Sequence, residues 1–277
     1  MFKKVAFIGA GSMAEAIITG VIGKGFLQPK QIYVTNKENQ ERLSRLRDVY
    51  NVVTSSDKKE VVKNADIVIL SMKPKDVKEG IESVKNEIKE NQLVVSVLAG
   101  ISTDFITAEL GKNVPVIRAM PNTSATIGFS ATAIAAGEYA YPQHVEAAKQ
   151  LFTNIGTTTV VDEDDLHAVT GISGSGPAYI YYLVEAMETA AKQAGLQEKV
   201  SKELIVQTLV GAAEMLKTTN ERPEDLRKKI TSPGGTTQAG LETLQKYNYQ
   251  EALIECVKSA TERSQELGRP YQRNPSL

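Results

Sequence analysis

Short apolar runs alternate with amphipathic stretches along the first half of the chain. The apolar runs are rich in β-branched residues and read KVAFIG, QIYVTN, VVTS, ADIVILS, QLVVSVLAG and VPVIRAM. Between them, apolar residues recur at helical spacing over residues 14–24, 38–47 and 77–88. This alternation predicts a parallel sheet with helices on both faces. Two further runs, ATAIAA and TTTVV, are expected to extend the sheet, with a helix over residues 142–152 between them.

The pattern becomes helical throughout after about residue 162. The acidic residues 162–165 are expected to begin a helix, because acidic side chains favour a helix N-terminus. The stretch SGSGPAYIYYLVEAMETAAKQAG predicts a long helix with Ser175 as N-cap, Pro177 in the first turn and Gly195 as the stop. Four more helices are predicted, near residues 201–217, 223–230, 236–246 and 249–267. We therefore predict an α/β sheet domain over residues 1–162 and an all-helical domain over residues 163–277.

Composition narrows the classes of protein that fit this plan. A chain of 277 residues exceeds one comfortable core and favours two domains, or one large α/β unit with an appendage. The net charge of -1, from 32 basic and 33 acidic residues, gives no reason to expect nucleic acid or an anionic membrane as partner. A single cysteine, Cys256, rules out an intrachain disulfide and favours a reducing cytoplasm. With only two histidines no metal site is expected, nor is a membrane span or a targeting segment.

The sequence GAGSMAEA follows the first apolar run and opens the first helical pattern. In this setting Gly9 allows a tight turn, Gly11 lets a pyrophosphate approach the backbone, and Ala14 lets helix and strand pack closely. The pyrophosphate would lie on the helix N-terminus. The loop predicts a dinucleotide-binding domain of the Rossmann type, a doubly wound sheet, although an ordinary strand–helix turn remains the alternative. The residues expected to contact the cofactor here are Ile8, Gly9, Ala10, Gly11, Ser12 and Met13.

The end of the second predicted strand indicates which dinucleotide is bound. Folds that prefer NAD usually place an acidic residue here to hold the ribose 2′-hydroxyl. This chain has Asn36 and Lys37, which suit a 2′-phosphate and favour NADPH, with NADH as a second possibility. Glu38 lies next in the chain and weakens this inference, and Lys37 could instead be a solvated surface charge.

Two more loops follow the carboxyl ends of predicted strands, where ligands bind in open α/β sheets. The first contains Ser71, Met72, Lys73 and Pro74, and the second contains Leu98, Ala99 and Gly100. Both are expected to line the nicotinamide half of the cofactor site. For the first loop, the alternative is that Lys73 and Pro74 only end the strand.

No residue stands out as the general acid or base that alcohol oxidation usually needs. His144 and His167 read as surface or structural residues, and Tyr179, Tyr181 and Tyr182 read as core or interface residues of the long helix. Reduction of a protonated imine needs less help, because the electrophile is already activated and the site can act largely by positioning. The absence of a base therefore favours C=N reduction.

A second glycine-containing loop, SPGGTT, spans residues 232–237. Paired glycines flanked by hydroxyl groups are typical of a backbone nest for an anion, here at the start of a predicted helix. The alternative is a plain turn between two helices. Since the glycine loop that starts at Gly9 already offers one anion site, the sequence leaves open why the chain has a second.

Six motifs occur in an order that resembles the pyrroline-5-carboxylate reductase family: GAGSMAEAI, LSMKP, SVLAGI, RAMPNT, TGISGSGPAY and TSPGGTT. The resemblance covers residues 5–267. It implies reduction of 1-pyrroline-5-carboxylate to L-proline, the last step of proline biosynthesis, with NADPH or NADH as hydride donor. It also implies a Rossmann domain followed by a helical domain that forms a homodimer, sometimes assembled into decamers.

The resemblance also implies roles for the residues of the second loop. Thr237 would be the catalytic residue, with its hydroxyl facing the ring nitrogen, while amides of Gly235 and Thr236 hold the substrate carboxylate. The full set of implied substrate contacts is Ser232, Gly234, Gly235, Thr236 and Thr237.

Two other functions remain open on the residues alone. A β-hydroxyacid dehydrogenase shares the domain plan, but that resemblance requires a catalytic lysine early in the long helix, where this chain has none before Lys192. A non-enzymatic NADP-binding sensor would have little use for a second anion-binding loop.

Overall fold

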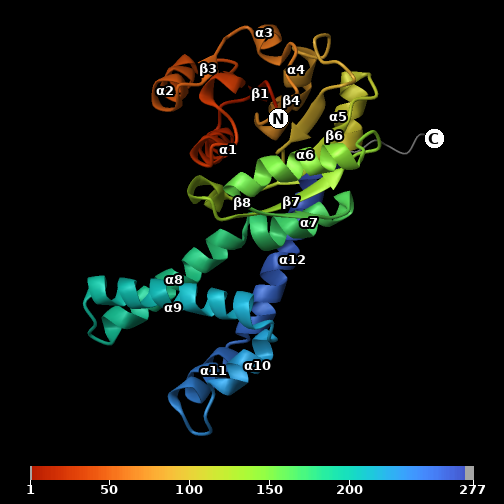
Figure 1. Cartoon of the computed structure of the whole chain (residues 1–277). Coiled ribbons are helices and arrows are strands. Elements are labelled where there is room, and N and C mark those ends of the chain that lie inside the picture. The colour runs from red at the N-terminus through yellow and green to blue at the C-terminus, as the bar shows by residue number, and fades with distance from the viewer. Residues whose placement is uncertain (1, 272–277) are drawn as a thin grey trace, which may run out of the picture. The chain divides into compact units, whose positions relative to one another are not determined.

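The structure, a computed structural model, describes residues 2–271. Contacts within the chain divide it into two compact units (Figure 1). Unit 1 comprises Met1–Pro177 and Lys258–Leu277, and unit 2 comprises Ala178–Val257. The predicted domain boundary after residue 162 stays a prediction, because a division by contacts does not show which part folds on its own.

Unit 1 contains an eight-stranded sheet in the order β3-β2-β1-β4-β5-β6-β7-β8. Its strands are β1 (Val5–Ile8), β2 (Ile32–Thr35), β3 (Val53–Thr54), β4 (Ile67–Leu70), β5 (Leu93–Ser96), β6 (Val116–Met120), β7 (Ser130–Ala136) and β8 (Gly156–Val160). The six predicted strands and their parallel pairing are confirmed, and both later runs extend the same sheet. The chain therefore has the α/β, doubly wound architecture that the sequence predicts.

One pair of neighbouring strands, β6 and β7, is antiparallel. The connection between them covers residues 121–129 and holds only a 3₁₀ helix, Thr123–Ile127. A parallel pair needs a crossover of a dozen or more residues, so this short connection returns the chain in the opposite direction. The next connection contains a full helix, α6 (Pro142–Phe152), and β8 accordingly lies parallel to β7.

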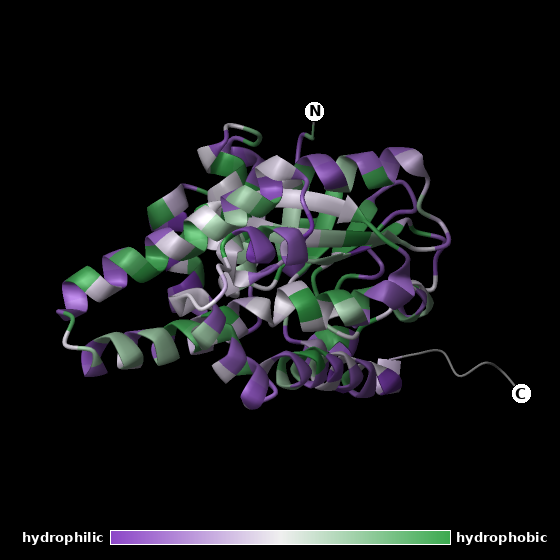
Figure 2. Cartoon of the chain, turned by 90° about the horizontal axis from the view of Figure 1, so that it is seen from below, coloured by the Kyte–Doolittle hydropathy of each residue, from purple (hydrophilic) through white to green (hydrophobic). Residues whose placement is uncertain are grey.

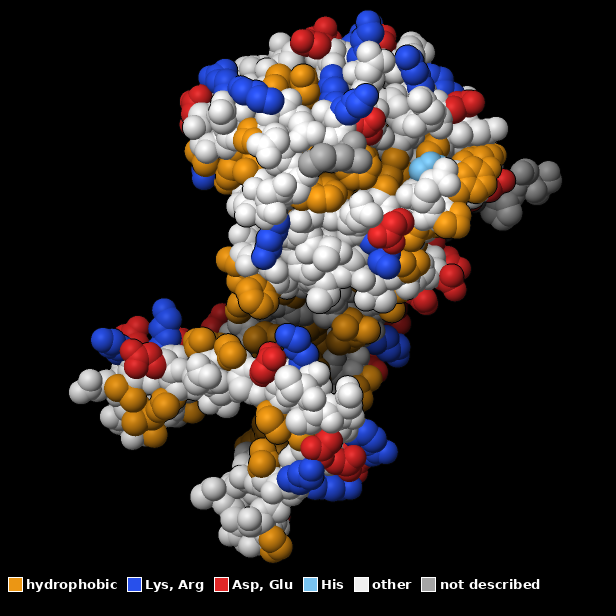
Figure 3. Space-filling model, in the orientation of Figure 1, with side chains coloured by type: hydrophobic (Ala, Val, Ile, Leu, Met, Phe, Trp, Pro, Cys, Tyr) orange, Lys and Arg blue, Asp and Glu red, His pale blue; other side chains and the backbone are white. Residues whose placement is uncertain are grey.

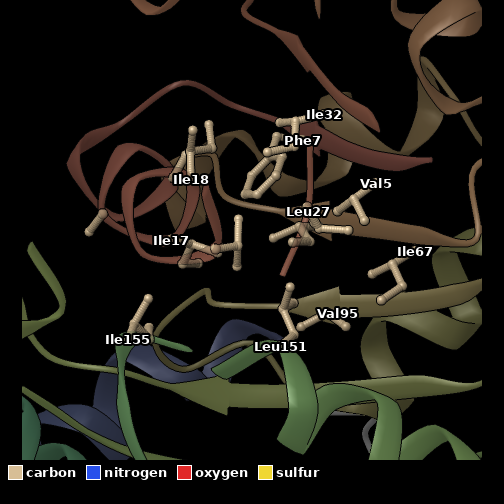
Figure 4. Close-up of a cluster of buried hydrophobic side chains, with 14 of the residues drawn as sticks. Val5, Phe7, Ile17, Ile18, Leu27, Ile32, Ile67, Val95, Leu151 and Ile155 are labelled. Carbon is tan, nitrogen blue, oxygen red and sulfur yellow. The ribbon is translucent and has the colours of Figure 1, made fainter. Parts of the chain in front are cut away.

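Three helices cover one face of the sheet: α1 (Ser12–Gly23), α2 (Gln40–Tyr50) and α6. Their apolar stripes pack against alternate residues of the strands, including Phe7, Ile67 and Val95 (Figure 4). Ile17 and Ile18 of α1 and Leu151 of α6 are fully buried in the same cluster. This packing fixes the start of α1 next to the end of β1.

The other face is covered by α3 (Lys58–Val62), α4 (Val77–Glu82) and α5 (Thr103–Leu110). The predicted helix over residues 77–88 is too long, since α4 ends at Glu82 and turns follow. Val84 and Ile88 are nevertheless buried, so the turns place both apolar side chains in the core as a longer helix would. Helix α4 thereby brings its exposed side beside the loop after β4.

The connection to the helical region departs from the predicted helix start. Helix α7 (Leu166–Val169) runs into a π-helical turn, Thr170–Gly174, and then into α8 (Gly176–Gln193). Ser175 has helical dihedrals, φ -87° and ψ -19°, and its N–H donates to the Thr170 carbonyl. An N-cap residue is extended, so the expectation for Ser175 is wrong, because the π-turn already carries the chain into α8.

Unit 2 is built only from helices. They are most of α8, α9 (Glu198–Thr219), α10 (Pro223–Lys229), α11 (Thr236–Lys246) and the first part of α12 (Tyr249–Gly268). Across residues 178–257, all of which the structure describes, Ser201 and Ile205 are the only buried residues. The helices carry both hydrophobic and hydrophilic residues along their length (Figure 2), and apolar side chains lie on their surface (Figure 3).

Single-turn 3₁₀ helices connect several other elements, at Pro29–Gln31, Pro74–Asp76, Thr153–Ile155, Glu163–Asp165 and Arg269–Tyr271. Over the described residues, each helix is either too short or too polar to cross a bilayer.

Candidate active site

The glycine loop after β1 is closely packed against the loop after β4. Gly9 has φ +113°, and a Cβ atom there would lie 2.5 Å from the Ser71 carbonyl carbon. Its N–H donates to the Thr35 carbonyl of β2 at 3.0 Å. Only glycine combines this dihedral with this lack of space. Gly11 is the N-cap of α1, so the helix N-terminus opens directly after the loop.

Arg42 of α2 holds this loop from behind. Its Nε donates to the Ala10 carbonyl at 2.7 Å, and its Nη2 reaches the Gly11 carbonyl at 3.4 Å. Nη2 also donates to Glu15 Oε2 at 2.5 Å, and Glu15 Oε1 accepts from the Tyr50 hydroxyl at 3.0 Å. Although partial burial alone raises the pKa of Glu15, the bonds from Arg42 and Tyr50 outweigh it and lower the pKa. Glu15 therefore stays ionised and keeps Arg42 in place.

These loops border a pocket of about 880 Å³. The predicted cofactor residues that line it are Ile8, Gly9, Ala10, Gly11, Ser12, Met13, Asn36, Lys37, Ser71, Met72, Lys73 and Pro74. Residues that the sequence did not single out also line it, among them Lys58 at the start of α3 and Glu79 of α4. Neither carried a motif that could have revealed it, because each comes from a helix far along the chain from the glycine loop.

The loop after β5 does not border this pocket. Leu98 is buried in the core on the α3–α5 face, and Ala99 is exposed. Gly100 has φ +77° and packs against Gly268 of α12, where a Cβ atom would come within 3.2 Å of the Gly268 Cα. These residues do not line the pocket, and their role at the nicotinamide stays a prediction.

Lys37 is paired with a carboxylate from another element. Its Nζ lies 2.7 Å from Glu79 Oε2 and 3.8 Å from Glu38 Oε1. The hydrogen bond between Lys37 and Glu79 raises the pKa of the lysine and lowers that of the carboxyl group. Asn36 uses its Oδ1 to accept the N–H groups of Glu38 and Asn39, and so shapes the turn that presents Lys37.

The second glycine loop lies in unit 2, directly before α11. Gly234 has φ +71°, and its N–H donates to Gln238 Oε1 at 2.7 Å. Gly235 is the N-cap of α11, and its N–H donates to the Ser232 carbonyl at 3.0 Å. The amides of Thr236 and Thr237 belong to the first turn, where N–H groups have no acceptor within the helix. Ser232, Gly234 and Thr236 are exposed and Thr237 is half-buried.

The histidines have structural surroundings. His167 is buried and its Nδ1 lies 3.0 Å from Ser264 Oγ; burial first, and then the charge of Arg118, lowers its pKa. His144 Nδ1 accepts a hydrogen bond from the Tyr141 N–H at the start of α6.

Tyr181 and Tyr182 are exposed at 61% and 77%, so they are not core residues of this chain. Within the part of the chain that the structure describes, acidic, His and Cys side chains form no cluster suited to a metal ion.

The doubly wound sheet, the closely packed Gly9 and the helix N-terminus beside a large pocket define a dinucleotide-binding protein of the Rossmann class. Residues 4–100 match the family model described as NADP oxidoreductase coenzyme F420-dependent. Residues 163–267 match the model described as pyrroline-5-carboxylate reductase dimerisation.

Full-length relatives narrow the assignment. The chain is 49% identical to pyrroline-5-carboxylate reductase 2 of Bacillus subtilis over 96% of this chain and 95% of the relative. The structure of a pyrroline-5-carboxylate reductase from Coxiella burnetii is similar, with TM-score 0.88 and 35% identity, covering 96% of this chain and 98% of that one. The Streptococcus pyogenes enzyme has TM-score 0.86 and 28% identity, over 95% and 98%. The chain belongs to the pyrroline-5-carboxylate reductase family.

Proposed function

We propose that this chain reduces 1-pyrroline-5-carboxylate to L-proline with NADPH as hydride donor. The observation that carries the proposal is the 49% identity to a pyrroline-5-carboxylate reductase over 96% of the chain. The two glycine loops add a physical reason, since the reaction brings together a dinucleotide and a substrate carboxylate. The last step of proline biosynthesis is the corresponding place in metabolism, and the cytoplasm is its expected location.

The pocket beside the glycine loop suits a dinucleotide. A Cβ atom at Gly9 would meet backbone of the β4 loop, so this backbone is shaped for close approach. The amides at the start of α1 would hold the pyrophosphate, and Lys37 would face the ribose 2′-position. Bound NADPH supplies the hydride. The protein's part is to hold and orient it and to keep Lys37 charged near a 2′-phosphate, and we expect NADPH to be preferred over NADH.

The loop before α11 is the proposed carboxylate site. The first-turn amides of Thr236 and Thr237 are suited to the carboxylate, whereas the Gly235 amide would first have to leave the Ser232 carbonyl. The Thr237 hydroxyl would lie at the imine nitrogen, where it orients the ring. Such a site needs no strong base, since a protonated imine accepts a hydride directly.

Family membership argues against a β-hydroxyacid dehydrogenase and against a non-enzymatic NADP-binding sensor, and two features of the chain agree with this. The helix in which a β-hydroxyacid dehydrogenase would need its lysine, α8, has Lys192 only in its last turn. A sensor without activity would leave the second loop without a role.

The test is to incubate the protein with 1-pyrroline-5-carboxylate and NADPH and to follow both NADPH absorbance and proline. We expect stoichiometric NADPH loss and proline gain. Turnover of a hydroxyacid instead, or nucleotide binding without turnover of the imine, would contradict the proposal.

We also propose that unit 2 forms a homodimer, which further assembly could extend to a decamer. Unit 2 has only two buried residues, too few to stabilise a unit of residues 178–257 alone. Exposed apolar side chains on α8 and α9 include Tyr182, Leu204 and Val210. An obligate interface would bury roughly 2,000–5,000 Å². Light scattering at micromolar protein should give a dimer or larger, and a stable, active monomer would contradict this assignment.

A further inference from the structure

The ribose end of the proposed cofactor pocket contains the carboxylate of Glu79, which is distant in sequence from the other residues there. Glu79 lies on α4, 42 residues after Lys37, yet its Oε2 contacts Lys37 Nζ at 2.7 Å. Both side chains are about half exposed, at 50% for Lys37 and 57% for Glu79, and both line the pocket. The lysine assigned to the 2′-phosphate is thus already occupied by an anion of the protein itself.

This arrangement resembles an NAD site assembled from different elements. Dinucleotide folds that prefer NAD place a carboxylate after the second strand, where it accepts a hydrogen bond from the 2′-hydroxyl and repels a 2′-phosphate. Here Asn36 and Lys37 follow β2, and Glu38 after them lies 3.8 Å from Lys37 Nζ. The carboxylate that contacts the lysine directly, at 2.7 Å, comes from α4. Among the charged side chains that line the pocket, Lys37 and Glu79 therefore favour opposite cofactors.

We infer that Glu79 is a specificity-determining residue that limits the preference for NADPH by competing with the 2′-phosphate for Lys37. The inference rests on the proposed function and deepens it. Bound NADPH must draw Lys37 away from Glu79, whereas NADH leaves the pair intact. Lys58, which also lines the pocket, supplies a second positive charge near Glu79. When the 2′-phosphate takes Lys37, Lys58 can partly neutralise the released carboxylate.

The exposure of Lys37 and Glu79 limits how strongly their ion pair can affect discrimination between NADPH and NADH. Exposed ion pairs are weak, so loss of the Glu79 charge should change nucleotide discrimination by about two- to fivefold. The change should shrink at high salt, because salt screens interactions between exposed charges.

The experiment measures dissociation constants of NADPH and NADH by calorimetry, for the full chain and for Glu79→Gln. The ratio of the NADH constant to the NADPH constant should rise about two- to fivefold in the variant, mainly through tighter NADPH. The matched control is Glu82→Gln on the same helix, which removes a carboxylate paired with Lys85 at 2.7 Å outside the pocket. Its ratio should equal that of the unmodified protein.

A second background tests the competition itself. In Lys37→Gln the Glu79→Gln change should have less effect on the ratio, because there is no lysine left to release. An unchanged ratio in Glu79→Gln, with both nucleotides still bound, would overturn the inference. So would an equal shift in the two backgrounds, or a similar shift in Glu82→Gln. If the unmodified protein bound neither nucleotide, the proposed function would fail together with the inference.

Discussion

The two glycine loops of this chain are held in place in very different ways. The loop after β1 is fixed by β2 through the Gly9 amide, by the β4 loop through close packing, and by α2 through Arg42. The loop before α11 has its glycine amides bonded only within its own segment, to Ser232 and to Gln238. This difference fits the proposed roles, because a rigid loop suits a pyrophosphate group and an open loop suits a small substrate that must enter and leave.

The two loops also differ in how well buried their surroundings are. The glycine loop lies against the sheet core, where Phe7 and Ile17 are fully buried. The second loop lies in a unit with two buried residues, Ser201 and Ile205. The proposed cofactor loop is thus shaped by the folding of unit 1, while the proposed substrate loop depends on a unit that needs a further surface to bury its apolar residues.

The largest effect is expected from a substitution at Gly9, where the loop after β1 is packed most closely against its neighbours. Gly9→Ala would place Cβ 2.5 Å from the Ser71 backbone at a φ of +113°, so the loop must move. We expect both NADPH and NADH to bind at least about a hundredfold more weakly, or about 3 kcal/mol, as measured by fluorescence titration.

The control for this change is Gly23→Ala at the last residue of α1, where an added Cβ meets nothing within 4 Å. It should bind both nucleotides normally and be slightly more stable, because alanine favours the helix. Normal binding by Gly9→Ala would show that the loop is not the rigid cradle described here.

Removal of the support behind the loop should have a smaller effect. Arg42→Ala deletes the bonds to the Ala10 and Gly11 carbonyls and leaves Glu15 without its closest partner. We expect about tenfold weaker binding of both nucleotides and a stability loss of about 1–3 kcal/mol in urea titrations.

Arg45→Ala is the matched control, since Arg45 lies 3.9 Å from Glu15 with a side chain 64% exposed. Its binding should be close to normal. A selective loss of NADPH in Arg42→Ala would contradict a role behind the pyrophosphate, because that role affects both cofactors equally.

The smallest effect is expected from loss of a single side-chain hydrogen bond in the loop before α11. Gln238→Ala removes the side-chain oxygen that accepts the Gly234 amide at 2.7 Å. KM for 1-pyrroline-5-carboxylate should rise about threefold, which corresponds to one exposed hydrogen bond, while the dissociation constant of NADPH stays constant. A large loss of NADPH binding would show that the two loops are not independent.

The sequence predicted the fold well because its signals are local. Apolar runs with β-branched residues marked the strands of the sheet, and Gly9 and Gly11 between VAFI and a helical pattern marked the tight turn between β1 and α1. The start of α11 after Gly235 was likewise readable from the glycine pair.

The parts that the sequence did not predict depend on tertiary contacts. Arg42 and Glu15 are 27 residues apart and meet only because α1 and α2 cover the same face of the sheet. Glu79 reaches Lys37 from α4 across 42 residues. Ser175 reads as a helix cap from its neighbours, but the preceding π-turn, which no local pattern indicates, removes the helix start there.

The most direct test of the account is the kinetics of Thr237→Ala beside its matched variant Thr237→Ser. Thr237→Ala should lower kcat/KM about ten- to a thousandfold, or about 1.4–4 kcal/mol, with the NADPH dissociation constant unchanged. Thr237→Ser keeps the hydroxyl and should recover much of the activity. A folded, fully active Thr237→Ala, or a defect that appears as lost NADPH binding with normal turnover at saturation, would contradict the separation of cofactor and substrate between the two loops.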